Sequence, residues 1–294
     1  MRISLTVTNF SWPVDAAGLR PRLEAVVCAA DEAGLDTVWV ADHLLQADPN
    51  ATPDSEMLEA YTTLGFLAGQ TRRVRLGTMV TAATFRPAAL LVKAVTTLDV
   101  LSGGRAWLGI GAGYHGDEAR AMGLSLPPVA ERFDRLEETL RLAMQMWSGD
   151  ASPFEGRYLR LERPVGNPLP VQRPHPPILI GGMGERRTLR LVAQYGDACN
   201  LFDIPDGGRT VKHKLDVLAA HCEAVGRPYA EIEKTISTRL EDGETAEHFA
   251  ERCAALAALG IDHAVVLTAG PPTEEAVATL AAAAAYAPPP PAAA

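Results

Sequence analysis

Basic clusters, long apolar runs and paired cysteines are all missing from this sequence. The 27 Lys and Arg residues are outnumbered by 36 Asp and Glu residues, which gives a net charge of −9. Because nucleic acids and anionic membranes attract basic surfaces, this balance argues against both as partners. No stretch of about 18 consecutive apolar residues is present, which argues against a membrane-spanning helix. We therefore expect a globular protein that acts on a small-molecule substrate.

The four cysteines, Cys28, Cys199, Cys222 and Cys253, are far apart and form no CxxC pair. Three of them fall in segments whose pattern predicts the interior of a helix or a strand. Cysteines of this kind are typical of reduced thiols in a protein core. We expect a cytoplasmic protein on this ground.

Short apolar runs alternate with longer amphipathic segments along the chain. Strands are predicted at residues 2–8, 37–41, 75–80, 105–110, 177–180, 198–202, 232–237 and 264–267. Helices are predicted at residues 19–34, 55–71, 87–101, 129–147, 185–194, 213–225, 246–259 and 273–285. Strands joined by helical crossovers imply a parallel sheet, and eight such units imply closure into a (β/α)₈ TIM barrel, an α/β fold.

A doubly wound open sheet is the main alternative to the barrel. It should carry a glycine-rich phosphate turn directly after the first strand, and the segment TNFSWPVDA has none. We therefore predict a single barrel domain over residues 1–285, followed by a disordered Pro/Ala tail over 286–294. Residues 148–176, between the fourth helix and the fifth strand, interrupt the alternation of strands and helices. Their sequence predicts an insertion with a small strand of its own. Insertions of this length commonly cover the active-site mouth.

Polar residues that follow the strands are the candidates for chemistry, because active sites of such barrels lie at the carboxyl ends of the strands. Asp42 and His43 follow the second strand. A histidine there can exchange a proton near neutral pH, and a carboxylate can orient it or bind a ligand. The alternative interpretation, in which His43 only forms a hydrogen bond to a loop, remains open at this point.

Two glycine-rich turns follow neighbouring strands. One is the GGMGERRTL stretch at residues 181–189, which leads into a helix, and the other is the GIGAG stretch at 109–113. Glycines let the backbone approach an anion, and amide groups at a helix N-terminus attract phosphate. Either turn alone is also compatible with a purely structural role. Together they favour a phosphate site, although neither is a Walker loop.

The stretches VWVADHL, RVRLGTMVTAATFRP, RAWLGIGAGY, ERFDRLEETLRLAMQMW and PPILIGGMGERRTL resemble the luciferase-like monooxygenase superfamily. More narrowly, they resemble its actinobacterial branch of oxidoreductases that depend on a deazaflavin, coenzyme F420. The resemblance extends over roughly residues 1–270. It is specific for the fold, less so for the cofactor, and does not identify the substrate.

The resemblance implies roles for individual residues. His43 corresponds to a proton donor or acceptor beside the cofactor ring, with Asp42 next to it. The Met79-Val80 step corresponds to a bulge in the third strand that often holds a non-prolyl cis peptide behind the ring. Thr81 and Thr84 fall where relatives contact the ring or the tail of the cofactor. The cofactor-binding residues implied in this way are Asp42, Met79, Val80, Thr81, Gly113, Gly182, Met183 and Gly184, and the catalytic ones are His43 and Asp42.

The sequence departs from these relatives around the expected substrate pocket. Tyr114 follows Gly113 where some members of the sugar-phosphate dehydrogenase branch carry a catalytic glutamate. Glu59 and Tyr61 occupy a stretch where many relatives have Glu and Trp, which assigns both residues to the pocket together with Tyr114. Lysines that would bind a phosphorylated substrate are not evident around the predicted mouth. We therefore expect a substrate other than a sugar phosphate.

The function expected from the resemblance is hydride transfer between reduced coenzyme F420 and a small organic substrate. An FMN-dependent monooxygenase that uses dioxygen is the alternative, since the same fold supports it. A non-catalytic protein that binds a flavin or deazaflavin is a second alternative. We expect no metal ion in the site, and barrels of this family often form homodimers.

Overall fold

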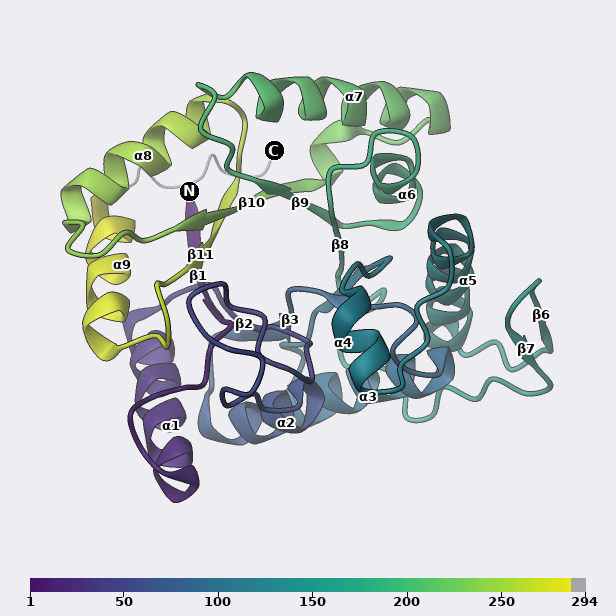
Figure 1. Ribbon diagram of the computed structural model, residues 1–294. Helices are drawn as coiled ribbons and strands as arrows, with labels where there is room; N and C mark the ends of the chain where they lie inside the picture. Colours follow the sequence, from purple (N-terminus) through teal and green to yellow (C-terminus); the bar gives the residue numbers. More distant parts are fainter. Residues whose placement is uncertain (287–294) are drawn as a thin grey trace.

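The computed structural model describes residues 1–286 of the 294-residue chain and has the architecture of a closed barrel. Its main sheet is parallel throughout, with the strand order β3-β2-β1-β11-β10-β9-β8-β5-β4. The circle closes because both β3 and β4 lie beside β5: Leu76 bridges Ala106, and Thr81 pairs with Ile110. Figure 1 looks into this barrel, with helices around the strands. The predicted TIM-barrel fold is confirmed.

The barrel strands are short and mostly buried on both faces, as parallel strands covered by helices must be. In the described residues, eight positions around the barrel are filled by these segments: β1 (Arg2–Val7), β2 (Thr37–Val40), β3 (Arg75–Thr78) with β4 (Thr81–Ala82), β5 (Leu108–Gly111), β8 (Ile178–Gly181), β9 (Ala198–Phe202), β10 (Glu233–Arg239) and β11 (His263–Leu267). The predicted third strand is thus one strand in two pieces, interrupted at Met79 and Val80.

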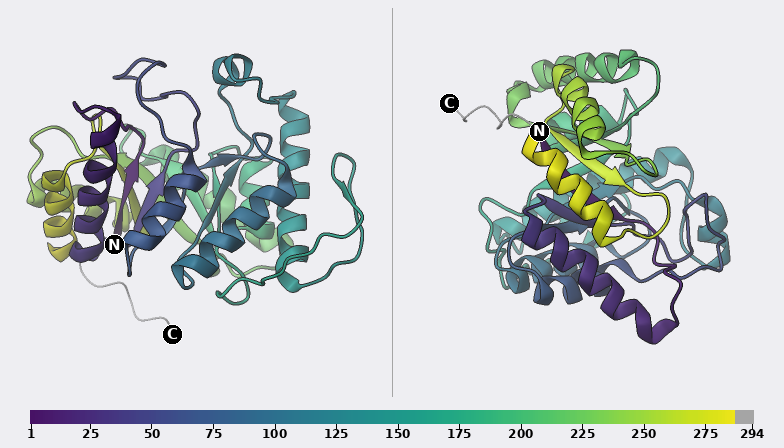
Figure 2. Two further views of the ribbon diagram at one scale, coloured as in Figure 1. Left: turned by 90° about the horizontal axis from the view of Figure 1, so that it is seen from below. Right: turned by 90° about the vertical axis from the view of Figure 1, so that its left-hand side faces the viewer.

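The helices pack around the outside of the strands (Figure 2). They are α1 (Ala16–Ala33), α2 (Ala60–Gln70), α3 (Ala88–Ser102), α4 (Gly116–Ala121), α5 (Val129–Ser148), α6 (Thr188–Tyr195), α7 (Arg209–Val225), α8 (Ala246–Ala258) and α9 (Glu274–Tyr286), with a 3₁₀ turn at Tyr229–Glu231. Eight of these correspond to predicted helices, and α4 was not predicted. None of the helices among residues 1–286 is both long enough and apolar enough to cross a membrane.

Three further predictions concern single segments. The insertion between α5 and β8 does carry its own hairpin, formed by β6 (Phe154–Glu155) and β7 (Arg160–Leu161). The four cysteines are free thiols, and three of them are buried. Of the tail predicted at 286–294, Tyr286 is the last residue of α9, and residues 287–294 lie outside the described part of the chain.

The interior of the barrel is filled by large side chains below its mouth. Trp39 and Trp107 lie side by side with their ring centroids 5.6 Å apart, and both are buried. Met79 and Val80 pack on this interior cluster. Above Met79 and Val80 the barrel is no longer filled by side chains, and a cavity opens there.

A group of charged residues closes the other end of the barrel. His263, which is fully buried, lies 2.7 Å from Glu233 through its Nδ1, and Arg2 lies 2.8 Å from Glu233. Arg75 pairs with Asp36 beside them. Burial raises the pKa of Glu233, but the hydrogen bond from His263 and the charges of His263 and Arg2 outweigh it, so that the pKa lies below its ordinary range. A network of paired charged side chains therefore lies at this end of the barrel.

We expect Glu233→Gln to lower the free energy of unfolding at pH 7 by on the order of 3 kcal/mol, since it leaves buried charges without their partner. A lowered pKa means that Glu233 stabilises the fold above its unfolded pKa of about 4.3, and that this contribution is lost as the pH falls through the folded value. The difference between wild type and variant should therefore shrink on acidification. Urea unfolding at pH 7 and pH 3 measures it, since pH 3 lies well below the unfolded pKa of the carboxyl, with the exposed Glu162→Gln as control. A constant difference at both pH values would contradict this account.

Candidate active site

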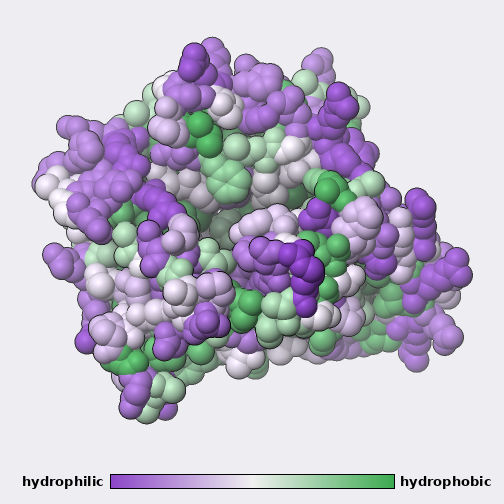
Figure 3. Space-filling model, viewed as in Figure 1, coloured by the Kyte–Doolittle hydropathy of each residue, from purple (hydrophilic) through white to green (hydrophobic). Residues whose placement is uncertain are grey.

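A cavity of about 1130 Å³ opens at the carboxyl ends of the strands. Every barrel position contributes to its wall, in the strand or directly after it, through Thr6, Asp42, Ala82, Gly111, Gly181, Asn200, Ser237 and Leu267. The hollow is visible near the centre of the face in Figure 3, where residues of low polarity gather. Its position is that of active sites in barrels of this fold.

The β2–α2 loop and α4 rise around the mouth of this cavity (Figure 2, left). Ala47, Asp48 and Pro49 of the loop line the cavity, and Asp48 accepts a hydrogen bond of 2.9 Å from the buried Asn9 at the end of β1. The expectation that residues 148–176 cover the mouth is wrong, since none of them lines the cavity. They connect the end of a helix to the start of a strand, and such connections lie at the opposite end of a barrel.

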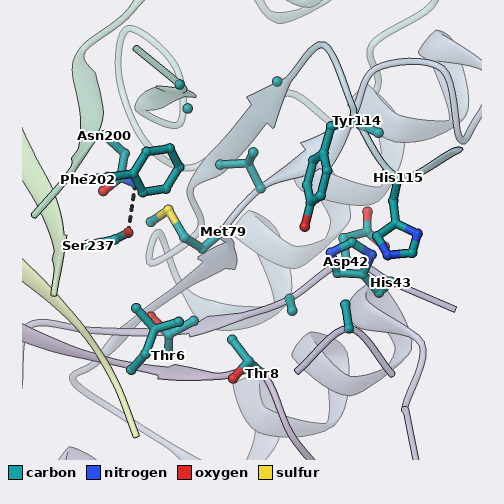
Figure 4. Close-up of a pocket in the computed structure, with 18 of the residues that line it drawn as sticks. Thr6, Thr8, Asp42, His43, Met79, Tyr114, His115, Asn200, Phe202 and Ser237 are labelled. Carbon is teal, nitrogen blue, oxygen red and sulfur yellow. Dashed lines mark hydrogen bonds between the residues drawn. The ribbon is translucent and has the colours of Figure 1, made fainter. Parts of the chain in front are cut away.

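His43 stands in the wall of the cavity within a group of aromatic rings. Its ring centroid is 6.0 Å from that of Tyr114 and 5.6 Å from that of His115, both in edge-on contact. Figure 4 shows the three rings on one side of the cavity, across from Asn200, Phe202 and Ser237. His43 Nδ1 lies 2.8 Å from Glu118 Oε2. The structure thus places His43 against the cavity, with a carboxylate as its partner.

Glu118 belongs to α4, the helix that the sequence did not predict. Its side chain is about 1% exposed, and its Oε1 accepts hydrogen bonds from the amides of Leu44 (2.5 Å) and Leu45 (3.2 Å). Burial raises the pKa of Glu118, but the hydrogen bonds from His43 and Leu44 outweigh it, and the pKa lies below its ordinary value. Glu118 is therefore a carboxylate at neutral pH. Because α4 has only six residues, apolar periodicity could not reveal it.

Asp42 lines the cavity but does not orient His43. The residue is 3% exposed, and its carboxylate accepts two hydrogen bonds from Arg86, of 2.5 and 2.9 Å, and one of 2.7 Å from Thr81 Oγ1. Two N–H groups of one guanidinium on both carboxylate oxygens form a bidentate pair, which fixes the plane of the carboxylate. Arg86 is thus a part of the site that we had not assigned.

Glu59 and Tyr61 lie behind Asp42, and neither lines the cavity. Glu59 caps the start of α2 and accepts a 2.5 Å hydrogen bond from Arg86, whereas the Tyr61 hydroxyl lies 2.9 Å from Thr81 Oγ1. Their expected place in a substrate pocket does not match these positions. The physical reason is that α2 begins at Ala60 rather than near residue 55, so that Glu59 is its N-cap residue, and that contacts with Arg86 and Thr81 engage the two side chains. Thr81 is likewise buried beneath Asp42 instead of facing the cavity.

The floor of the cavity is formed at the break between β3 and β4. The Met79-Val80 peptide bond is cis, as the resemblance implied. Val80 lies over two glycines of the next strands: a Cβ atom on Gly111 or Gly181 would come within 3.0–3.1 Å of the Val80 methyl groups. The glycines therefore leave room for Val80, and Val80 in turn presents an apolar surface to the cavity.

The part of the cavity near β5 and β8 has the features of an anion site. Gly113, Gly182 and Thr188 line it, together with Arg132 from α5. Arg132 donates to the Gly113 carbonyl oxygen, while its Nε is buried and has no hydrogen-bond partner in the described residues. A cation with an unused donor next to a glycine turn and the first residue of a helix favours a phosphate or carboxylate group.

The remaining predicted residues lie next to this end or outside it. Met183 and Gly184 are not among the lining residues: Met183 Sδ accepts from the Phe202 amide at 3.4 Å, and Gly184 packs against Thr188. Thr84 also lies outside the wall. Tyr114, by contrast, lines the cavity and is 73% exposed. The structure thus brings seven of the predicted residues together in the cavity wall: Asp42, His43, Met79, Val80, Gly113, Tyr114 and Gly182.

Comparison with known proteins connects this site to a family. The sequence profile of the luciferase-like monooxygenases matches residues 1–259. The chain is 35% identical over 224 residues to an F420-dependent glucose-6-phosphate dehydrogenase from Kineococcus radiotolerans, which covers 73% of this chain and 62% of that protein. It is 32% identical over 209 residues to an F420-dependent hydroxymycolic acid dehydrogenase from Mycobacterium tuberculosis, which covers 70% of this chain and 55% of that protein. The match spans less than two thirds of either relative.

A solved structure supports the fold. An F420-dependent secondary alcohol dehydrogenase in complex with an F420-acetone adduct superposes with a TM-score of 0.80, covering 96% of this chain and 98% of that chain. The two sequences are 18% identical, so the likeness concerns the fold and not the chemistry.

Proposed function

Because the chain belongs to the luciferase-like monooxygenase family, we propose that it is an oxidoreductase that transfers a hydride between reduced coenzyme F420 and a small organic substrate. The relatives named for F420-dependent reactions support this choice of cofactor. The observation that carries the proposal is the division of one cavity into an anion site, an apolar floor and a histidine in its wall.

The floor and the anion site fit the two parts of such a cofactor. Val80, with Gly111 and Gly181 beneath it, offers an apolar surface for a flat ring system, and no side chain projects from the two glycines. Arg132 has a donor to spare, and the backbone near Gly113 and Gly182 can approach a phosphate closely. These residues would hold the ring at one end and the phosphate at the other.

The deazaflavin, when bound, supplies a ring carbon that donates or accepts the hydride. The protein then has to hold the ring and the substrate at contact distance, and to manage the proton that accompanies the hydride. His43 is the side chain for the second task, because its ring faces the cavity and imidazole exchanges protons near neutral pH. Asp42, held by Arg86 and Thr81, contributes a fixed carboxylate beside it.

We also propose that the substrate is not a sugar phosphate. No lysine lines the cavity among the described residues. Of the three arginines that do, Arg132 belongs to the anion site, Arg252 is paired with Glu244 at 2.8 Å, and Arg239 is exposed at the end of β10. The cavity wall also contains Phe202, Pro205 and Leu267, which favour a substrate with an apolar body. An apolar alcohol or ketone needs no charged partner, so the charged side chains of the cavity would remain available to bind the cofactor.

Titration of the purified full chain with F420 and, in parallel, with FMN tests the cofactor. We expect saturable quenching of F420 fluorescence. We also expect hydride transfer from apolar secondary alcohols to oxidised F420, or from reduced F420 to the corresponding ketones, but no hydride transfer with glucose 6-phosphate or its lactone. If FMN binds and F420 does not, the proposal is lost, and oxygen uptake with reduced FMN would then indicate a monooxygenase. Turnover of glucose 6-phosphate would overturn the assignment of the substrate alone.

A further inference from the structure

The contact between His43 and Glu118 decides which ring nitrogen faces the cavity. Only Nδ1 of His43 lies against Glu118, at 2.8 Å, and the two residues are 75 positions apart in the chain. The low pKa of Glu118 keeps it ionised, and an ionised carboxylate can only accept hydrogen bonds. The proton of a neutral His43 ring therefore resides on Nδ1, which leaves the lone pair of Nε2 free.

The second oxygen of Glu118 ties the same carboxylate to the chain that carries His43. Oε1 accepts from the amides of Leu44 and Leu45, the two residues that directly follow His43. One buried carboxylate thus fixes both the ring and the backbone on which the ring is mounted. With three donors on its two oxygens, Glu118 has little freedom to rotate.

We infer that Glu118 is a positioning residue, which holds His43 as the Nδ1–H tautomer so that Nε2 exchanges the proton in the cavity. This inference rests on the proposed function for its role in catalysis, although the tautomer itself does not depend on any cofactor. Orientation of an imidazole by a carboxylate on its other nitrogen is the same logic that operates in Ser-His-Asp triads.

The other ionisable groups around His43 leave this role to Glu118. Tyr114 and His115 approach the ring edge-on at 6.0 and 5.6 Å between centroids, and neither forms a hydrogen bond to it. His115 Nδ1 accepts from the Glu118 amide at 3.2 Å and so caps α4. Asp42, the neighbour in sequence, is engaged by Arg86. Among the described residues, Glu118 is the carboxylate in contact with the ring.

The variant Glu118→Gln should change the tautomer of His43 while keeping the hydrogen bonds that hold the backbone of Leu44 and Leu45. The carbonyl oxygen of the introduced amide can still accept from Leu44 and Leu45, which directs its NH₂ group toward His43 Nδ1. Nδ1 must then accept, and the proton moves to Nε2. Glu118→Asp keeps a carboxylate and should retain the wild-type tautomer in part. Asp117→Asn removes an exposed carboxylate from the same helix and serves as the matched control.

Nitrogen-15 NMR of histidine-labelled, cofactor-free protein reads the tautomer directly. We expect Nδ1–H for His43 in the wild type and in D117N, and Nε2–H in E118Q. A wild-type ring protonated on Nε2, or the same tautomer in the wild type and E118Q, would overturn the inference. This measurement stands whether or not the protein uses F420, so it can fail separately from the proposed function.

Kinetics with F420 test the consequence for catalysis. We expect E118Q to lower kcat by about 10²-fold or more, the range of a lost general acid or base, with KM for the substrate changed less than kcat. D117N should match the wild type, and E118D should recover part of the rate. Wild-type kcat in E118Q, with the tautomer reversed, would show that the proton does not pass through Nε2.

Discussion

Alanine in place of His43 should lower kcat by about 10²–10⁴-fold while the affinity for the cofactor changes little. The expected loss is large because His43 lines the cavity, can exchange a proton, and is held by the buried carboxylate of Glu118. Its removal also leaves the Glu118 charge buried with only the two amides of the loop. Binding should persist, since the residues of the proposed phosphate site, Gly113, Arg132, Gly182 and Thr188, do not include His43. Stopped-flow oxidation of reduced F420 and fluorescence titration measure the two quantities separately.

The control for this variant is His248→Ala, which removes an exposed histidine on α8. It should keep the wild-type rate. An unchanged kcat in H43A would remove His43 from the mechanism. A large loss of affinity together with kcat would instead assign His43 to cofactor binding.

Valine in place of Gly182 should weaken cofactor binding by tenfold or more. Gly182 has φ = +116°, a conformation that side chains with a Cβ atom rarely adopt, and it lies in the glycine turn before α6. Strain of this kind costs about 1–3 kcal/mol, and the turn can relieve it only by moving its amides away from the anion site. A change of 1.4 kcal/mol in binding corresponds to a factor of ten. Isothermal titration with F420 provides the measurement.

Gly34→Val separates backbone strain from the effect on the site. Gly34 also has a positive φ, +76°, and a Cβ atom there meets nothing within 4 Å. It ends α1 and lies outside the cavity wall. We expect this variant to lose stability but to keep its cofactor affinity. Equal affinities in G182V and the wild type would locate the phosphate elsewhere.

The barrel could be predicted because each of its strands and helices has a recognisable pattern within its own short stretch of sequence. Each strand is a short apolar run and each helix an amphipathic segment, so the alternation that defines the fold can be recognised without knowing any contact. Two of the errors concern segments whose place cannot be recognised from local pattern. Helix α4 is too short for periodicity, and the β6–β7 segment was assigned to the mouth although it connects a helix to a strand.

The site was predictable only in part, for a related reason. His43, Asp42 and the glycine turns could be identified because they directly follow strands. Glu118 and Arg86 could not be assigned, since their contacts join residues 75 and 44 positions apart and depend on how loops fold over the mouth. Arg132 lacks any motif of its own, and its unused Nε becomes visible only in three dimensions.

The packing of Val80 on Gly111 and Gly181 has a consequence for how the family can vary. Three neighbouring barrel positions share one small volume, although the residues lie 31 and 70 positions apart in the printed sequence. A methyl group added to either glycine can be accommodated only if residue 80 becomes smaller or shifts into the cavity. Substitutions at these positions should therefore be correlated among relatives, with larger residues at 111 or 181 accompanied by smaller ones at 80. Engineering that widens or narrows the floor of the cavity would have to change the three positions together.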